Sequence, residues 1–434
     1  MQVKKKVNQD HKNSFKKVVV RYDVIVVGGG PAGMMAAGRA AELGAKVGLL
    51  EKNDKLGKKL LITGGGRCNI TNAEFDVRKM VGKYGAKGKA LFGSFSRFGV
   101  EDTLQFFNTR GLPTKTEAEK RAFPESNKAA DVWKVMVNYL KQKNTHGSVE
   151  VISNSPVTKV LFSNGKITGV VTKTKTYIAT NYIIATGGKS RPETGSTGEG
   201  YKWMSGIGHN VEESDPALVP VKIQEDWVKK LSGLSFTNAK LTIFQDNKKQ
   251  ESGAGKMLFT HFGISGPLVL NMSKNIAELF KYAPVSLQLD LYPDIDAVAL
   301  DKKMLASLSS ALNKKIKNNL GGIVPPKMIP AILQLTGISP DIESNNLTKE
   351  QRRKIVTLVK ALPMNVDGFL GVEKAVVTSG GVSLKEIDFK TMQSKLFSNL
   401  YLAGDILNFD RPSGGFSLQI CWTTGFLAGE NSAK

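Results

Sequence analysis

The sequence has little of what disulfide frameworks, metal centres and membrane spans require. It contains two cysteines in 434 residues, Cys68 and Cys421, which form neither a CxxC pair nor a disulfide framework, so a reducing cytoplasm is expected. The longest chargeless run near the start, residues 24–38, is interrupted by glycines and a proline and is too short to cross a bilayer. We therefore predict a cytoplasmic protein with no metal site and no membrane partner.

Acidic residues are scarce relative to basic ones. The chain has 61 Lys and Arg against 38 Asp and Glu, for a net charge of +23, and +6 of this falls on residues 1–22. We expect residues 1–22 to be a basic flexible tail. The remaining +17 leaves two explanations open. One is an anionic partner, which is a nucleic acid, a phosphorylated substrate or a membrane surface, and the other is a lysine-rich proteome.

A glycine-rich turn between two apolar runs stands out near the start of the chain. Residues 24–27 are typical of a strand buried on both faces, and the pattern G-x-G-x-x-G follows at once. In this pattern Gly28 allows a tight turn, Gly30 lets the backbone approach a pyrophosphate, and Gly33 lets a helix pack against the strand. Pro31 and Ala32 begin that helix, whose N-terminal amides would face the pyrophosphate.

A second strand, residues 46–50, leads into Glu51 and Lys52. A carboxylate at this position accepts hydrogen bonds from the ribose of an adenosine. Strand, glycines, helix, second strand and acid all occur at the required offsets. The sequence therefore predicts binding of an adenine dinucleotide, with NAD and FAD as the alternatives.

Three distant segments favour FAD. Each ends a predicted strand or begins a helix where a dinucleotide would lie: Thr186, Gly187 and Gly188, then Gly404 and Asp405, then Gly414, Gly415 and Phe416. Asp405 is placed to hold a ribityl hydroxyl, and the helix after Gly415 would point its amides at the flavin. No second G-x-G-x-x-G follows a strand, so NAD(P)H is expected only as a transient electron donor.

The chain resembles the family of three-domain bacterial FAD-dependent oxidoreductases that includes aminoacetone oxidase and the BaiN and YhiN proteins. The resemblance covers nearly everything after residue 22 and rests on GKKLLITGGGRCNITN, RAFPESNKAADV, TGSTGEGY, LFTHFGISGP, AVVTSGGVSLKEIDFKTMQSKL and the final GGFSLQ. The family's C-terminal turn commonly reads GEVLDVDGPTGGYN, whereas this chain has GDILNFDRPSGGFS. Asn408 and Arg411 thus replace an acid and a glycine, and Phe416 replaces a tyrosine. We expect FAD binding to survive and substrate choice to differ.

The resemblance, together with the periodicity of apolar residues, predicts an interrupted α/β fold. A doubly wound, glutathione-reductase-like FAD-binding domain comprises residues 23–213 and 383–434. A β-rich domain of residues 214–292 and 363–382 interrupts it and carries a helical cap of residues 293–362. The resemblance implies that the cap covers the flavin side, so its basic segments 313–319 and 349–354 are the expected RNA-binding surface.

Candidate chemical residues gather after the second strand. Lys59 and Arg67 are predicted to hold pyrophosphate oxygens or the flavin's pyrimidine edge, beside Gly65, Cys68 and Asn69. Cys68 has no second cysteine at short range, so a small buried structural role is favoured over a redox role. The catalytic candidates are Arg67 and His261, although a hydrogen-bonded structural histidine is an equal alternative for His261.

The resemblance implies two functions. One is a flavin-dependent reductase of a C=C bond, with a ribosomal RNA uridine that becomes dihydrouridine as the substrate that suits the positive charge. The other is a small-molecule flavoenzyme, either an aminoacetone-type amine oxidase or an enoate reductase. A flavin-binding scaffold without turnover is a third class.

Overall fold

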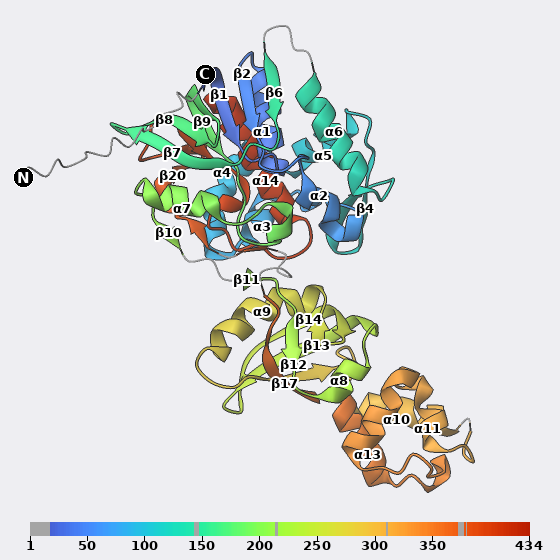
Figure 1. Ribbon diagram of the computed structural model, residues 1–434. Helices are drawn as coiled ribbons and strands as arrows, with labels where there is room; N and C mark the ends of the chain where they lie inside the picture. The colour runs from blue at the N-terminus through green and yellow to red at the C-terminus, as the bar shows by residue number, and fades with distance from the viewer. Residues whose placement is uncertain (1–17, 143–146, 213–215, 310, 372–376, 379) are drawn as a thin grey trace, which may run out of the picture.

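Three parts follow one another along the molecule: an α/β domain, a β-barrel and a group of helices (Figure 1). The computed structural model describes residues 18–142, 147–212, 216–309, 311–371, 377–378 and 380–434. The α/β domain is built from both ends of the chain, whereas the barrel and the helices come from its middle. None of the helices in these residues combines the length and the hydropathy of a membrane span.

A nine-stranded sheet forms the centre of the α/β domain. Five strands run parallel in the order β6 (Ser148–Ile152), β2 (Lys46–Leu50), β1 (Val18–Val27), β9 (Lys175–Ile184) and β22 (Leu400–Leu402). On the edges lie β7 (Val157–Ser163), β8 (Lys166–Thr172), β20 (Ile387–Asp388) and β21 (Gln393–Ser394). The apolar run of residues 24–27 lies in the middle of this sheet and is buried, as a parallel strand covered on both faces requires. The predicted doubly wound α/β fold is confirmed.

Strand β1 begins earlier than the sequence predicts. The predicted flexible tail includes residues 18–22, but the structure pairs them with β9, with Val18 opposite Lys175 and Tyr22 opposite Ala179. Valine favours a pleated strand, and the charge of Arg21 does not oppose it because that side chain is exposed. The rest of the predicted tail, residues 1–17, lies outside the described residues.

The first and last long helices of the α/β domain cross in close contact. They are α1 (Pro31–Glu42) and α14 (Phe416–Ser432). A methyl group at Gly425 would lie 2.5 Å from the Ala32 carbonyl oxygen, and one at Gly429 would lie 2.3 Å from that of Ala36. Only glycine permits this approach, so the C-terminal segment is shaped to lie on the first helix.

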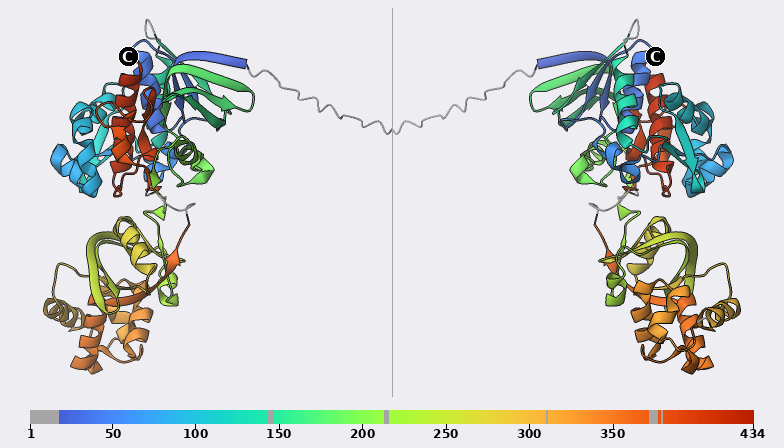
Figure 2. Two further views of the ribbon diagram at one scale, coloured as in Figure 1. Left: turned by 90° about the vertical axis from the view of Figure 1, so that its left-hand side faces the viewer. Right: turned by 90° about the vertical axis from the view of Figure 1, so that its right-hand side faces the viewer.

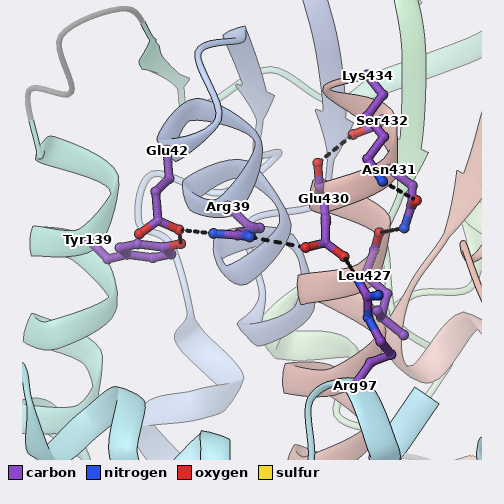
Figure 3. A network of polar contacts seen from close by, with 10 residues as sticks. Arg39, Glu42, Arg97, Tyr139, Leu427, Glu430, Asn431, Ser432 and Lys434 are labelled. Carbon is purple, nitrogen blue, oxygen red and sulfur yellow. Dashed lines mark hydrogen bonds and ion pairs between the residues drawn. The ribbon is translucent and has the colours of Figure 1, made fainter. Parts of the chain in front are cut away.

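An ion network closes one side of this crossing (Figure 3). Arg39 lies between Glu42 (2.7 Å) and Glu430 (3.1 Å), and Arg97 of α4 (Phe92–Arg97) pairs with Glu430 at 2.6 Å. Tyr139 of α6 (Ala129–Lys141) donates to Glu42 at 3.1 Å. Burial opposes ionisation of Glu430, but the hydrogen bonds from the two arginines lower its pKa. The network thereby joins four helices.

Shorter elements complete the α/β domain. A three-stranded sheet orders β3 (Thr71–Asn72), β5 (Arg121–Pro124) and β4 (Thr114–Glu117). The helices are α2 (Lys58–Ile62), α3 (Val77–Gly82), α5 (Val100–Asn108) and α7 (Glu199–Gly206).

The inserted barrel is closed. Its strand order is β12 (Val221–Ile223), β15 (Gly263–Ser265), β14 (Lys248–Thr260), β13 (Ser235–Gln245), β16 (Ser286–Asp290) and β17 (Leu362–Phe369), with helices α8 (Asp226–Lys230) and α9 (Pro267–Phe280). Two short antiparallel pairs connect it to the α/β domain: β10 (Val211–Glu212) with β19 (Gly381–Val382), and β11 (Pro216–Ala217) with β18 (Val377–Thr378). These pairs fall near the expected boundaries at residues 214 and 382.

The helical insertion consists mainly of α10 (Ala297–Ser309), α11 (Ile316–Asn319), α12 (Ile329–Thr336) and α13 (Lys349–Lys360). Its buried side chains, among them Leu300 and Ile355, form one continuous core with those of the barrel. Figures 1 and 2 show these helices on the side of the barrel that faces away from the α/β domain. The expectation of a cap over the flavin is therefore wrong for this arrangement, because the insertion leaves the barrel between Asp290 and Leu362, at its far end.

Candidate functional site

A cleft lies at the carboxyl ends of the parallel strands. This is the edge where doubly wound sheets bind ligands. Its lining comes from six regions of the chain: residues 27–32, 50–53, 57–59, 155–157, 185–187 and 194–196, with Glu199, Trp203, Asp405 and Cys421. The cleft thus brings together ten of the predicted cofactor residues: Gly28, Gly30, Pro31, Ala32, Glu51, Lys52, Lys59, Thr186, Gly187 and Asp405.

The glycine turn has the geometry that its spacing predicts. Gly28 has φ +107°, and a methyl group there would lie 2.6 Å from the carbonyl oxygen of Ala185. A methyl group on Gly33 would lie 1.8 Å from the carbonyl oxygen of Gly28, so the helix can meet the strand only through glycine. A methyl group on Gly30 would meet nothing within 4 Å. The free space beside Gly30, at the N-terminus of α1, is the cradle that a pyrophosphate fills.

Glu51 holds the turn as well as facing the cleft. Its Oε2 accepts a hydrogen bond from the backbone N–H of Gly29 (2.8 Å), and its Oε1 accepts from the backbone N–H and side-chain amide of Asn53 (both 2.8 Å). The residue is buried, with 7% of its surface exposed. The carboxylate is therefore fixed between the glycine turn and the loop after β2, where an adenosine ribose would lie.

The two predicted lysines of the cleft are tied to its opposite wall. Lys52 pairs with Glu199 of α7 at 2.7 Å. Lys59 donates to Ser190 at 2.5 Å and lies 3.7 Å from Asp405. Burial opposes ionisation of Glu199, but hydrogen bonds from Lys52 and Thr197 lower its pKa. These contacts fix the positions of both ammonium groups in the cleft where a dinucleotide would lie.

Buried polar atoms without hydrogen-bond partners test whether FAD fits these residues. In the cleft lining, among the described residues, Oγ1 of Thr186 and Oδ1 of Asp405 are such atoms. Oδ1 of Asp405 lies 3.2 Å from Nη1 of Arg411, so only the Thr186 hydroxyl is left without a charged neighbour. Unsatisfied buried polar groups are rare without a reason. Together with the space at Gly30, the Thr186 hydroxyl fits a polar ligand such as FAD.

Arg67 and Cys68 do not line the cleft; other side chains of the α/β domain surround them. Arg67 pairs with Glu117, bonds to Asn127 and lies over the ring of Phe123, 4.1 Å from its centroid. These contacts commit the guanidinium to the β4–β5 hairpin, so the predicted cofactor and catalytic roles of Arg67 have no support in this geometry. Cys68 is fully buried, and burial raises the pKa of its thiol to about 12, which agrees with the favoured structural interpretation.

His261 lies far from the cleft in the fold. It occupies the exposed turn between β14 and β15 of the barrel. Ile223 donates a backbone hydrogen bond to the carbonyl oxygen of Phe262, which places the turn at the end of β12 that leads away from the α/β domain. The structure therefore does not bring His261, one of the two catalytic candidates, to the cleft.

The C-terminal glycines serve packing. A methyl group on Gly415 would lie 2.3 Å from the carbonyl carbon of Thr71, so α14 begins in contact with β3. A methyl group on Gly404 would lie 2.8 Å from Cβ of Ala32. Outside the cleft lining lie the predicted residues Gly33, Gly65, Arg67, Cys68, Asn69, Gly188, Gly404, Gly414, Gly415 and Phe416.

The sequence does not predict several of the residues that line the cleft. They are Asn53, the loop of residues 155–157, the segment of residues 194–196, Trp203 and Cys421. One signal could have found the first two groups: Asn53 lies just beyond β2 and residues 155–157 just beyond β6, at the carboxyl edge of a parallel sheet. The motif TGSTGEGY marked residues 194–196 without giving them a role.

Comparisons with known proteins agree with this geometry. A family model described as the HI0933-like protein Rossmann domain matches residues 22–431. The chain is 30% identical to the 3-dehydro-bile acid delta(4,6)-reductase of Clostridium scindens, over 94% of this chain and 98% of that protein. It is 26% identical to the ribosomal RNA dihydrouridine synthase of Escherichia coli K12, over 95% of this chain and 98% of that protein.

A solved structure shares the fold. The 3-ketosteroid-delta4-(5alpha)-dehydrogenase from Rhodococcus jostii RHA1 matches with a TM-score of 0.53 at 14% identity, over 98% of this chain and 99% of that chain. These matches confirm the family resemblance drawn from the motifs. They also confirm the prediction that the protein is an FAD-dependent oxidoreductase.

Proposed function

The chain belongs to the HI0933-like family of FAD-dependent oxidoreductases, and we propose that it reduces the C=C bond of a uridine in ribosomal RNA to give dihydrouridine. Bound FAD supplies the hydride chemistry. The chain's own residues hold the dinucleotide: Gly30 leaves space for the pyrophosphate, Glu51 faces the adenosine ribose, and Asp405 with Lys59 lines the ribityl end.

One observation carries the choice of RNA: a group of unpaired cations on the α/β domain. No Asp or Glu occurs between Glu150 and Glu193. Four lysines of this segment, on and between β7, β8 and β9, are exposed, and none has a carboxylate within ion-pair distance among the described residues: Lys159, Lys166, Lys173 and Lys175. Unpaired cations on one sheet are what a phosphate backbone requires. We call these four residues the lysine face.

The lysine face replaces the surface that the sequence predicts on the helical insertion. There Arg352 makes two hydrogen bonds to Asp301 (2.6 and 3.1 Å), and Lys315 and Lys317 share Asp341 (3.0 and 2.8 Å). These lysines lower the pKa of Asp341 to about 2, so its charge persists and offsets theirs. Four of the seven cations of segments 313–319 and 349–354 are therefore in ion pairs, with three carboxylates, whereas none of the four on the lysine face has such a pair with a described residue.

The lysine face lies toward the start of β9, and the cleft lies at the carboxyl ends of β1 and β9. At its near end the lysine face meets the cleft, because Lys159 lies two residues from Val157 of the cleft lining. At its far end Lys175 begins β9, a strand of ten residues that spans roughly 30 Å at about 3.3 Å per residue. A row of cations that starts beside the cleft and continues away from it suits a macromolecular substrate, whereas a small substrate needs only the flavin.

A small-molecule C=C substrate is the second candidate. It is favoured by the 30% identity to a bile acid reductase, which exceeds the 26% identity to the ribosomal RNA enzyme. Under this function the lysine face has no role in catalysis. For either substrate we propose NAD(P)H as a transient electron donor and a cytoplasmic location, which suits two buried free cysteines.

Deletion of the gene followed by mass mapping of ribosomal RNA tests the proposal. We expect one uridine to lose the two-hydrogen mass increment and to regain it with the wild-type gene. Complementation with Gly30→Val, which should not hold FAD, and with glutamate at all four positions of the lysine face should fail. Unchanged ribosomal RNA in the deletion strain would favour the small-molecule reductase. Normal complementation by the glutamate variant would show that the lysine face does not bind the RNA substrate.

A further inference from the structure

A buried arginine stands behind the cleft at Arg411. Its side chain is 0% exposed, yet its Nε and Nη1 have no hydrogen-bond partner. Nη2 donates to the carbonyl oxygen of Leu407 at 2.8 Å, and Nη1 lies 3.2 Å from Oδ1 of Asp405, close enough for an ion pair but not aligned as a hydrogen bond. A guanidinium offers five donors, so keeping it buried with so few partners is costly.

Asp405 is shared between this arginine and the cleft. Its Oδ1 is buried and faces Arg411, while its Oδ2 lies 3.7 Å from Nζ of Lys59, a cleft-lining residue. Asp405 itself lines the cleft, whereas Arg411 does not. The two carboxylate oxygens therefore have different surroundings, one held from behind and one turned toward the ligand space.

The loop that carries Arg411 is anchored on its outer side. Asp410 pairs with Lys274 of α9 at 2.7 Å, and the backbone N–H of Ser413 donates to Oδ1 of Asn271 at 2.9 Å. Lys274 and Asn271 lie three residues apart on one helix and face the same loop. These two contacts fix the backbone on both sides of Arg411, and so the position of its guanidinium beside Asp405.

We propose that Arg411 is a positioning residue for FAD: it holds Oδ1 of Asp405, so that Oδ2 faces the cleft to accept a hydroxyl of the cofactor. The corresponding position is a glycine in the C-terminal turn GEVLDVDGPTGGYN, which this chain otherwise resembles. Arg411 acts through Asp405 and does not itself touch the ligand space.

Binding of FAD to the apoprotein tests the proposal through a double-mutant cycle. Arg411→Met removes the charge at similar volume, and Asp405→Asn removes the carboxylate. We expect Arg411→Met to raise the Kd for FAD by about 10–100-fold, the range of a lost charged hydrogen bond. In the Asp405→Asn background the same change should alter Kd by less than about twofold, because Arg411 then has nothing to position.

A merely structural arginine predicts additive losses in that cycle, and additivity would overturn the proposal. Arg110→Met is the matched control, since Arg110 also has a buried Nε without a partner but pairs with Glu42, away from the cleft. It should leave the Kd for FAD unchanged. If circular dichroism shows that Arg411→Met does not fold, the cycle is run with Arg411→Lys, for which a smaller loss, again absent with Asp405→Asn, is expected.

Discussion

The two hydrophobic cores of the molecule are built in different ways. The core of the α/β domain joins residues from both ends of the chain, and its helices and strands meet through glycines. The core shared by the barrel and the helical insertion comes from one continuous stretch, Val221 to Val366, and is filled by ordinary aliphatic side chains. Buried polar atoms without partners occur in both parts of the described chain, at Trp227 and Thr260 in the barrel and at several residues of the α/β domain. Only Thr186 and Asp405 among them line the cleft.

The largest contrast between the two cores should appear on adding one methyl group. Gly33→Ala would put Cβ 1.8 Å from the Gly28 carbonyl oxygen and force α1 away from β1. We expect a loss of about 3 kcal/mol or more in the free energy of unfolding, with loss of FAD. Gly321→Ala in the insertion meets nothing within 4 Å and should change stability by less than about 0.5 kcal/mol. Chemical denaturation of both variants measures the difference, and equal effects would contradict it.

A larger side chain at the open glycine should separate binding from stability. Gly30→Val fills the space reserved for the pyrophosphate, so FAD should be absent from the purified protein, while unfolding of the apoprotein is nearly unchanged. Flavin absorbance and denaturation of the same sample give both readouts. A yellow Gly30→Val protein with full FAD content would mean that the pyrophosphate lies elsewhere.

A smaller loss is expected from the carboxylate beside the turn. Glu51→Ala removes the acceptor for the N–H groups of Gly29 and Asn53 and for the ribose, and should weaken FAD binding by about 1.5–3 kcal/mol. The flavin absorption spectrum should stay unchanged, because Glu51 lies at the adenosine end. Glu51→Gln, which keeps one carbonyl acceptor, should lose less. A marked spectral shift in Glu51→Ala would reverse the assumed orientation of the cofactor.

The smallest effect is expected in the second core and depends on pH. Arg352 lowers the pKa of Asp301 by hydrogen bonding, so the pair adds stability above the unfolded-state pKa of about 3.9 and loses it as pH falls through the lower folded value. Arg352→Ala should cost about 1 kcal/mol at pH 7 and much less once the pH lies below the lowered pKa of Asp301 in the folded state. Arg353→Ala is the comparison variant: its exposed side chain makes no ion pair with a described residue, and its charge lowers the pKa of Asp301 less than Arg352 does, so the pH-dependent loss should be smaller. A cost independent of pH would show that packing, not charge, explains the loss.

The elements of the fold were largely readable from the sequence, and their contacts were not. The strand–glycine–helix pattern places Gly28, Gly30 and Gly33 correctly because each role depends on local backbone geometry. The places of Arg67 and His261 could not be predicted because tertiary pairing determines them. Arg67 pairs with Glu117 of β4, and His261 lies in a turn whose position depends on the pairing of the barrel strands. The carboxylates that pair with the basic segments of the insertion were missed for a similar reason, since Asp301 and Asp341 are distant in sequence from Arg352 and Lys317.

The crossing of α1 and α14 has a consequence for biosynthesis. The ribosome completes α1 at Glu42 and begins α14 only at Phe416, a delay of roughly 20–75 s at about 5–20 residues per second. During that time the small-residue face of α1 lacks its partner helix, so the nascent chain exposes apolar surface that a chaperone would recognise. The stretch from Val221 to Phe369 has its whole core available long before the chain is finished. The middle of the protein is therefore expected to fold before its beginning, and capture of FAD waits for the final helix.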